Sequence, residues 1–169
     1  MVLLIDNYDS FSYNLVQLIG ELTDGNIKVV RNDEITIDEI RKMNPESIIL
    51  SPGPGKPVDA GICEDVVRKL KDEYPILGVC LGHQILCEFF DGELYNLSSV
   101  RHGQKRRLKV RSNSGLFLGL PAEFEIGLYH SWAVQTESIP ETLEITAVCD
   151  DEIVMATQHK NLPIFSVQF

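Results

Sequence analysis

The feature that most constrains this chain is a cysteine framed by two glycines, in the run Gly78-Val79-Cys80-Leu81-Gly82. A short apolar run, Pro75-Ile76-Leu77, precedes it, and residues 85–90 have a helix-like pattern. A strand, a tight turn and a helix in this order form a nucleophile elbow, in which a strained bend that glycine permits exposes the central side chain. The start of the helix directs free N–H groups at the sulfur and favours its thiolate form. We therefore predict covalent cysteine chemistry at Cys80.

Short β-rich runs alternate with segments of helical periodicity in the first half of the chain. Thr36 and Glu39 have the spacing of a capping box, and Asp9-Ser10 is suited to cap the helix that follows it. Repeated βα units imply a parallel sheet with helices on both faces. Strands are predicted at 2–6, 27–30, 47–51 and 76–79, and helices at 11–22, 36–44, 63–70 and 85–90.

The second half of the chain is rich in strand-like runs joined by short polar turns, with little helical periodicity beyond a turn near Gly115. We see no internal repeat, so we expect one domain over residues 1–169. The predicted fold class is α/β, with an open, largely parallel central sheet flanked by helices and an added antiparallel β-rich half. Strands are expected at 108–110, 124–129, 132–134, 143–148, 153–157 and 164–169.

Composition excludes several classes of protein. The 169 residues carry a net charge of −10, which argues against nucleic acid as the main partner. No apolar stretch approaches a membrane span, and the apolar start runs straight into acidic residues, unlike a signal peptide. The four cysteines form no Cys-x-x-Cys pair, so neither a disulfide framework nor a zinc knuckle is expected. We therefore expect a cytoplasmic protein with no membrane partner.

The cysteines differ in their surroundings. Cys80 could be a small buried core thiol, but its glycine frame at a strand end favours catalysis. Cys63, Cys87 and Cys149 have no such frame and are predicted to pack in the core. His83 and Cys87 have the i, i+4 spacing of a helical metal site, but no third ligand is in register. We therefore predict that His83 is a hydrogen-bonded helix histidine and expect no metal.

Two further segments are candidates for the site. Gln84 lies one helical turn beyond the nucleophile, so its amide can reach back to a substrate held over Cys80. The loop Ser51-Pro52-Gly53-Pro54-Gly55 leaves the carboxyl end of a strand, and its glycines leave backbone N–H groups open to an approaching oxygen. Acyl transfer needs such donors for its oxyanion, and the Leu81 N–H is a second candidate. A plain Pro-Gly turn remains the alternative for the loop.

Basic residues and histidines are harder to interpret. Six Lys or Arg residues lie between 101 and 111, and we expect them to be solvated strand and loop residues. Docking to an acidic partner surface is the alternative, and RNA binding is less favoured because no stacking aromatic residues interleave. A thiolate nucleophile also requires a general base. None of the four histidines has an obvious base signature, although His130 is placed in a plausible loop.

With these residues in view, the chain closely resembles the class I, triad-type glutamine amidotransferases over essentially its whole length. Within that family, the opening Asp6-Asn7-Tyr8-Asp9-Ser10-Phe11 is similar to the branch that serves chorismate-using synthases, those of anthranilate and aminodeoxychorismate synthesis. The matching motifs are 4–11, Ser51-Pro52-Gly53-Pro54-Gly55, residues 78–84, His102-Gly103, Tyr129-His130-Ser131 and Val167-Gln168-Phe169.

The resemblance implies a flavodoxin-like fold and a glutaminase reaction that needs no cofactor. Cys80 would attack the side-chain amide of L-glutamine, release ammonia and form a glutamyl thioester that water hydrolyses. Gly53, Pro54, Gly55 and Leu81 would line the oxyanion and substrate site, and Gln84 would hold the glutamine. The main chain at Ser131-Trp132 would grip its α-amino and carboxylate ends. Ammonia would then pass by a sheltered path to a chorismate-using synthase subunit.

This sequence departs from the family pattern at three points. The family continues after Gln-Phe with His-Pro-Glu, which holds its base and orienting carboxylate, whereas this sequence ends at Phe169. We expect that the sequence is truncated before these two residues and that this polypeptide is nearly inactive. Asp91-Gly92 stands where Gly-Gly is usual, and residues 104–107 are unusually basic. The alternatives are a non-catalytic scaffold or regulatory subunit of such a synthase, and a cysteine hydrolase or redox sensor with a similar elbow.

Overall fold

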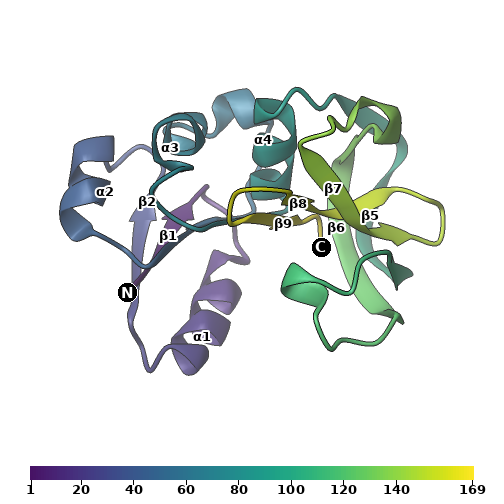
Figure 1. Cartoon of the computed structure of the whole chain (residues 1–169), viewed down its shortest axis with the longest axis horizontal. Coiled ribbons are helices and arrows are strands. Elements are labelled where there is room, and N and C mark those ends of the chain that lie inside the picture. The colour runs from purple at the N-terminus through teal and green to yellow at the C-terminus, as the bar shows by residue number, and fades with distance from the viewer.

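The computed structural model describes all 169 residues and contains one mixed sheet that runs through both halves of the chain (Figure 1). Its nine strands are ordered β2-β1-β3-β4-β9-β8-β7-β5-β6. The strands are β1 (Val2–Asp6), β2 (Ile27–Arg31), β3 (Ser47–Leu50), β4 (Ile76–Val79), β5 (Leu94–Val110), β6 (Glu123–Val134), β7 (Leu143–Cys149), β8 (Val154–His159) and β9 (Ile164–Val167). The helices are α1 (Ser12–Leu22), α2 (Ile37–Met43), α3 (Cys63–Leu70) and α4 (Leu81–Phe89).

The first five strands in sheet order, β2-β1-β3-β4-β9, are all parallel to their neighbours. Helix α1 covers one face of this part of the sheet, and α2, α3 and α4 cover the other (Figure 1). The predicted α/β class and the predicted parallel sheet with helices on both faces are therefore confirmed. No helix is both long and apolar enough to span a bilayer.

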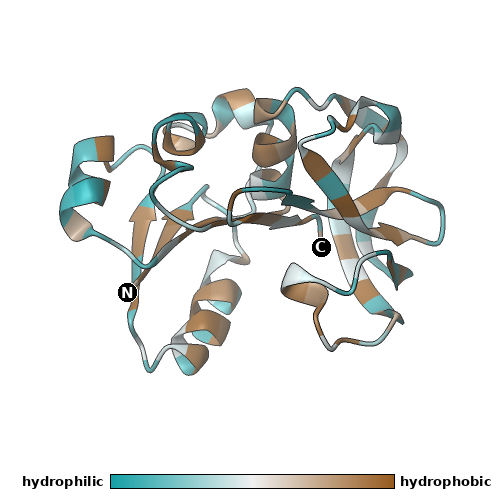
Figure 2. Ribbon diagram, in the orientation of Figure 1, coloured by the Kyte–Doolittle hydropathy of each residue, from teal (hydrophilic) through white to brown (hydrophobic).

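The side chains of each strand alternate between the two faces of the sheet, and this alternation builds the core of the parallel half. Leu3 and Ile5 face α2–α4 and belong to an 18-residue buried cluster, whereas Leu4 belongs to a smaller cluster packed against α1. Successive residues of a strand point to opposite faces, so a strand covered on both sides must be apolar at every position. The middle strands accordingly form one of the most continuously hydrophobic parts of the ribbon (Figure 2).

The sheet becomes antiparallel after β9, through β8, β7, β5 and β6. Strand β5 spans 17 residues, although the sequence predicts a strand only at 108–110. Strand β6 runs without a break through His130, where a loop was predicted. The prediction for β5 was wrong because most of this strand pairs with β6 alone, and exposed pairing of this kind needs few apolar side chains. The prediction for His130 was wrong because this polar residue occupies a buried position of β6 and so interrupts the apolar alternation.

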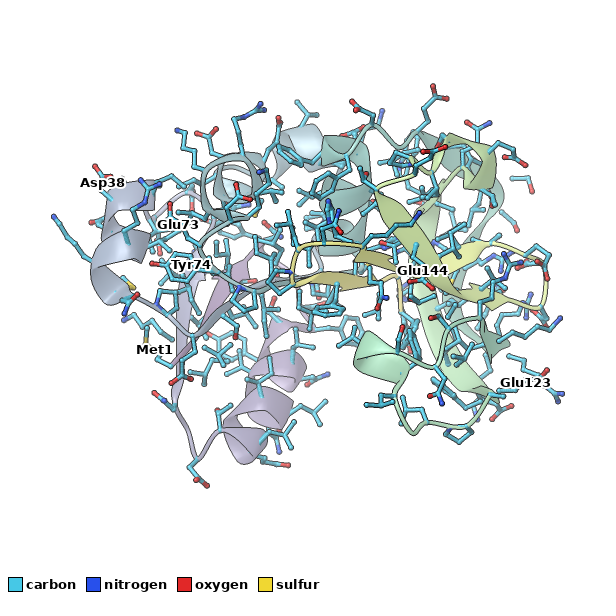
Figure 3. All side chains as sticks on the ribbon, viewed as in Figure 1. Met1, Asp38, Glu73, Tyr74, Glu123 and Glu144 are labelled. Atoms are coloured by element: carbon cyan, nitrogen blue, oxygen red, sulfur yellow. The ribbon has the colours of Figure 1, made fainter.

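The basic residues of 101–111 lie on β5 or directly after it and are mostly paired with acids of the same chain. Lys105 Nζ lies 3.6 Å from Glu125, and Arg107 lies 3.3 Å from Glu123. Arg101 pairs with Asp151, and Arg111 pairs with Glu152. Figure 3 shows Glu123 at one end of the molecule, far from Asp38 and Glu73 at the other. The basic run therefore serves cross-strand and turn pairing, which supports the prediction of solvated strand residues.

Helix ends follow the local sequence in most places. The predicted capping box of α2 is present, with the Glu39 N–H donating to Thr36 Oγ1 and the Thr36 N–H donating to Glu39. At α1, Asp9 Oδ2 accepts from the Phe11 N–H at 2.6 Å, so Asp9 satisfies a donor just before the first helical residue. Asp91, where the family usually has glycine, adopts a left-handed φ of 71° after α4.

Candidate active site

The predicted elbow is present between β4 and α4. Cys80 is the residue between them, with φ 53° and ψ −101°, a conformation that costs a non-glycine residue of order 1–3 kcal/mol. Its N–H donates to Val167 O at 2.8 Å, and its carbonyl accepts from the Gln84 N–H at 3.1 Å. These bonds to β9 and α4 hold the strained residue in place. The strand, turn and helix predicted from the sequence are therefore confirmed.

The two glycines act differently from what was predicted. The left-handed bend lies at Cys80 itself, and neither flanking glycine has a positive φ. A Cβ on Gly78 would lie 2.4 Å from Gly82 O, and a Cβ on Gly82 would lie 2.3 Å from Leu50 O. The glycines are required because the backbones of β4, α4 and β3 approach one another too closely for any side chain.

The sulfur opens onto two cavities, one on either side. The first, of about 190 Å³, is called the Cys80 pocket below. All eight residues predicted for the site line it: Gly53, Pro54, Gly55, Cys80, Leu81, Gln84, Ser131 and Trp132. The second cavity, of about 380 Å³, is more apolar and includes Phe11, Leu15, Tyr129 and Gln168 in its wall. Cys80 is partly exposed and lines both cavities.

Burial dominates the electrostatics of this sulfur. It raises the pKa of the Cys80 thiol to about 11, although hydrogen bonds from the Leu81 N–H and from Gln168 act to lower the pKa. The nearby charge of Asp9 adds to the increase. The N–H at the start of α4 favours thiolate, as predicted, but burial has the larger effect, so the predicted thiolate does not form unaided. Two donors do not replace the water that burial removes, so the sulfur is protonated at neutral pH and needs a base.

Gln84 joins the helix of the elbow to the opposite wall of the pocket. Its side chain is only 4% exposed, although a glutamine on a short helix is often at the surface. Its Nε2 donates to Trp132 O at 3.2 Å and to Gln168 Oε1 at 3.1 Å. Above the pocket wall, Lys56 Nζ lies 4.4 Å from the centre of the Trp132 ring. The amide of Gln84 therefore has a defined orientation.

Asn7 holds the glycine-rich loop beside the sulfur. The Asn7 N–H donates to Ser51 Oγ and its Nδ2 donates to Ser51 O, both at 2.9 Å. Gly53 packs so closely on it that a Cβ would lie 2.5 Å from Asn7 Cβ. The N–H groups of Gly53 and Gly55 make no hydrogen bond within the chain. The loop is therefore a fixed structure with free donors beside Cys80, not only a connection.

No histidine of these 169 residues hydrogen-bonds to the Cys80 sulfur. His130 lies in β6 instead of a loop, and its Nδ1 is 2.8 Å from Trp132 O. Burial lowers its pKa. His83 is buried behind the elbow, where its Nδ1 lies 2.7 Å from Ser166 Oγ, which confirms the prediction of a hydrogen-bonded helix histidine. Its pKa falls to about 3 because of burial.

Comparison with known proteins agrees with this geometry. Residues 3–169 match the family model for glutamine amidotransferase class-I. The chain belongs to this family. It is 54% identical to "Putative anthranilate synthase component II" of Haemophilus influenzae, over 99% of this chain and 86% of that protein. It is also 50% identical to the bifunctional protein TrpGD of Thermotoga maritima, over 99% of this chain and 28% of that longer protein.

The fold of this amidotransferase chain also matches a solved structure. The glutamine amidotransferase of Thermotoga maritima superposes with a TM-score of 0.81 at 14% identity, over 99% of this chain and 74% of that one. At such low identity the similarity concerns the fold alone. The architecture that brings the Cys80 pocket together is therefore preserved in chains with very different side chains.

Two residues of this amidotransferase site were not singled out from the sequence. Asn7 stands in the opening motif, and its buried amide was the available signal, because an asparagine directly after a buried strand requires a hydrogen-bond partner. Gln168 stands in the closing motif and contacts both Gln84 and Cys80. Cys63, Cys87 and Cys149 are buried, which confirms their predicted place in the core.

Proposed function

We propose that this protein is the glutaminase subunit of a synthase, hydrolysing L-glutamine to glutamate and ammonia through a thioester on Cys80. The single observation that supports this most is that eight residues from three separate segments line one pocket around the partly exposed Cys80. A pocket of about 190 Å³ suits a small amino acid. Family membership supports the same reaction.

The reaction follows from the groups around the pocket. A base takes the Cys80 proton, and the sulfur attacks the carboxamide carbon of glutamine. The resulting oxyanion receives hydrogen bonds from the free N–H groups of Gly53 or Gly55 and from Leu81. The C–N bond then breaks, the base returns its proton to the departing nitrogen, and ammonia leaves a glutamyl thioester. Water, deprotonated by the same base, attacks the thioester, and the sulfur leaves with a proton as glutamate forms.

The raised pKa of Cys80 makes the base indispensable, since only a minute fraction of the sulfur ionises unaided at neutral pH. The family supplies this base and its orienting carboxylate from a His-Pro-Glu segment after the Gln-Phe pair. We propose that a histidine and a carboxylate of this kind serve Cys80 in the active protein. Gln84 would hold the substrate amide, and the main chain of Ser131 and Trp132 would bind the α-amino and carboxylate groups.

The partner is proposed to be a chorismate-using, anthranilate-forming synthase subunit, because the relatives at 54% and 45% identity carry the name anthranilate synthase component II or 2. Ammonia must reach such a partner without protonation, since ammonium is not nucleophilic. The apolar cavity on the other side of the sulfur offers a sheltered exit. We expect this assembly in the cytoplasm, without a membrane or nucleic-acid partner.

The deciding experiment uses Cys80→Ser in the full protein, assembled with its synthase subunit. Product formation from glutamine is expected to fall by about 10⁴-fold or more, because the nucleophile is lost. Synthesis from added ammonia is expected to remain, since the partner needs only ammonia. Cys149→Ala, at a buried cysteine far from the pocket, serves as the matched control and retains both activities. If the two activities fall together in Cys80→Ser, the proposed division of labour is wrong.

A second measurement separates this function from that of a scaffold or a redox-sensing protein. Bound glutamine is expected to protect Cys80 from alkylation in the wild-type protein, because the substrate occupies the pocket around the sulfur. Mass spectrometry of the Cys80 peptide gives the extent of labelling. A rate of labelling that does not respond to glutamine would contradict the proposed substrate.

A further inference from the structure

We propose that Gln168 controls two groups of the active site at once: it hydrogen-bonds the Cys80 sulfur through Nε2, and it fixes through Oε1 the orientation in which Gln84 meets the substrate. The inference rests on the function proposed above, because it assigns Gln84 and Cys80 their roles in that reaction. It goes beyond that function by adding a positioning residue that sets the selectivity of the pocket for a carboxamide over a carboxylate.

The position of Gln168 is well defined. It directly follows β9, the strand between β4 and β8, and is 1% exposed. Its N–H donates to Met155 O at 2.8 Å, and the preceding carbonyl, Val167 O, accepts from the Cys80 N–H. The backbone that places Gln168 therefore also holds the strained elbow. The point from which the Gln168 side chain starts is therefore fixed beside Cys80.

The side-chain contacts form one continuous chain of hydrogen bonds. Gln168 Nε2 donates to Cys80 Sγ at 3.5 Å, and Gln168 Oε1 accepts from Gln84 Nε2 at 3.1 Å. Gln84 Nε2 also donates to Trp132 O at 3.2 Å. The chain thus links the nucleophile to the main chain proposed to bind the substrate α-groups.

This arrangement leaves only one hydrogen-bonding atom of the Gln84 amide free. An amide NH₂ has two donors, and both are used by Trp132 O and Gln168 Oε1. Only Gln84 Oε1, an acceptor, remains for a ligand in the Cys80 pocket. An acceptor suits the NH₂ of glutamine and opposes the carboxylate oxygens of glutamate. The pocket therefore rejects glutamate, whether it is the reaction product or free in the cell, because Gln168 fixes this orientation of the Gln84 amide.

The hydrogen bond from Gln168 to the sulfur of Cys80 has its main effect while the reaction takes place. A hydrogen bond to a charged acceptor is about twice as strong as one between neutral groups, so the Nε2–Sγ bond strengthens as the thiolate forms. No cationic side chain of the chain hydrogen-bonds to this sulfur, and Asp9 acts against ionisation. Gln168 is therefore the only side chain that donates a hydrogen bond to this sulfur.

Two variants separate the two roles. Gln168→Glu keeps an acceptor for Gln84 but removes the donor to the sulfur, whereas Gln168→Met, of similar length, removes both. The first measurement is the rate of Cys80 alkylation by iodoacetamide at about pH 9.5, where an introduced carboxylate is ionised even when buried. Gln168→Met is expected to react about tenfold more slowly than the wild type, corresponding to an increase of about one unit in the pKa of the sulfur. Gln168→Glu is expected to react more slowly still, because its carboxylate also repels the thiolate.

The second measurement is the discrimination between glutamine and glutamate, taken as the inhibition constant for glutamate divided by KM for glutamine. Gln168→Met is expected to reduce this ratio about tenfold, because Gln84 can then rotate and present its NH₂ to a carboxylate. Gln168→Glu is expected to retain the wild-type ratio while kcat falls. Gln135→Glu and Gln135→Met, at an exposed glutamine, are matched controls that change neither quantity.

Wild-type alkylation rates in both variants would overturn the role at the sulfur, and an unchanged ratio in Gln168→Met would overturn the role in selectivity. Thermal unfolding of each variant shows whether the fold survives the substitution. The alkylation rate requires no glutaminase activity, so its result does not depend on the proposed function. If Cys80→Ser behaves as proposed while the Gln168 variants match the wild type, the function stands and only this inference fails.

Discussion

The two halves of the molecule share one sheet but differ in what holds them together. In the parallel half, strands covered on both faces pack an 18-residue core against α2–α4. In the antiparallel half, a smaller core of 10 buried residues includes members of β5–β8, and the outer part of the long β5–β6 pair is exposed and carries ion pairs. The tightly packed half supplies the sulfur, the loop and Gln84, and the more exposed half supplies the main chain of Ser131 and Trp132. Reactive atoms thus lie where packing allows least movement.

Glycine substitutions are expected to show the largest difference between the halves. Gly82→Ala places a Cβ 2.3 Å from Leu50 O, and backbone cannot easily move away, so we expect a loss of about 3 kcal/mol or more in the free energy of unfolding. Gly103→Ala, on β5, meets nothing within 4 Å and carries only the strain of a φ of 65°, about 1–2 kcal/mol. Urea denaturation measures both.

Gly20→Ala is the control for these two substitutions. Gly20 lies inside α1, and its Cβ would lie 4.0 Å from Ile27 Cγ2, so alanine is expected to raise the free energy of unfolding by about 0.5–1 kcal/mol. Equal costs for Gly82→Ala and Gly103→Ala would show that packing at the elbow is no tighter than on the exposed strand.

His83 tests the junction between the halves, where α4 meets β9 through Ser166. Its pKa is about 3 in the folded chain because of burial, against about 6.5 when unfolded. Between these values the unfolded state binds a proton that the folded state does not. The free energy of unfolding is therefore complete above the unfolded pKa and falls by about 1.4 kcal/mol per unit as pH decreases towards 3.

The variant His83→Gln is expected to lose this contribution and to show a shallower decrease in stability below about pH 6. His130, whose pKa is also lowered by burial, contributes in the same direction in both proteins and so leaves the difference intact. His102→Gln, at an exposed histidine, is the control. The same slope in His83→Gln and the wild type would mean that this buried junction opens before the rest of the fold.

The smallest effect is expected at the ion pairs of the exposed half. Lys105→Ala and Arg107→Ala each remove one partner of a pair with Glu125 or Glu123, at side chains more than half exposed. Each is expected to lower the free energy of unfolding by less than about 1 kcal/mol, and added salt is expected to shrink the difference. Losses of several kcal/mol would show that the outer part of β5 and β6 depends on charge as strongly as the first half depends on packing.

Prediction from sequence succeeded for structures that are determined by a few neighbouring residues. We predicted the strands β1–β4, the capping box at Thr36 and the elbow at Cys80. Each of these depends on a local signal, which is the hydrophobic periodicity, the capping residues or the two flanking glycines. It failed along β5, where polar side chains on an exposed strand leave no apolar alternation. It also failed for the ionisation of Cys80, because burial depends on chain segments distant in sequence.

The amino-acid order alone determined the βα repeats, the family motifs and the identity of the cysteine, since these depend on neighbours in the chain. Tertiary structure decided that the loop after β3, the helix after β4 and the middle of β6 enclose one pocket. It also decided that Gln168 reaches both Gln84 and the sulfur. Such facts arise only when strands that are distant in sequence become neighbours in a sheet, because hydrogen bonds and desolvation act over ångströms in space.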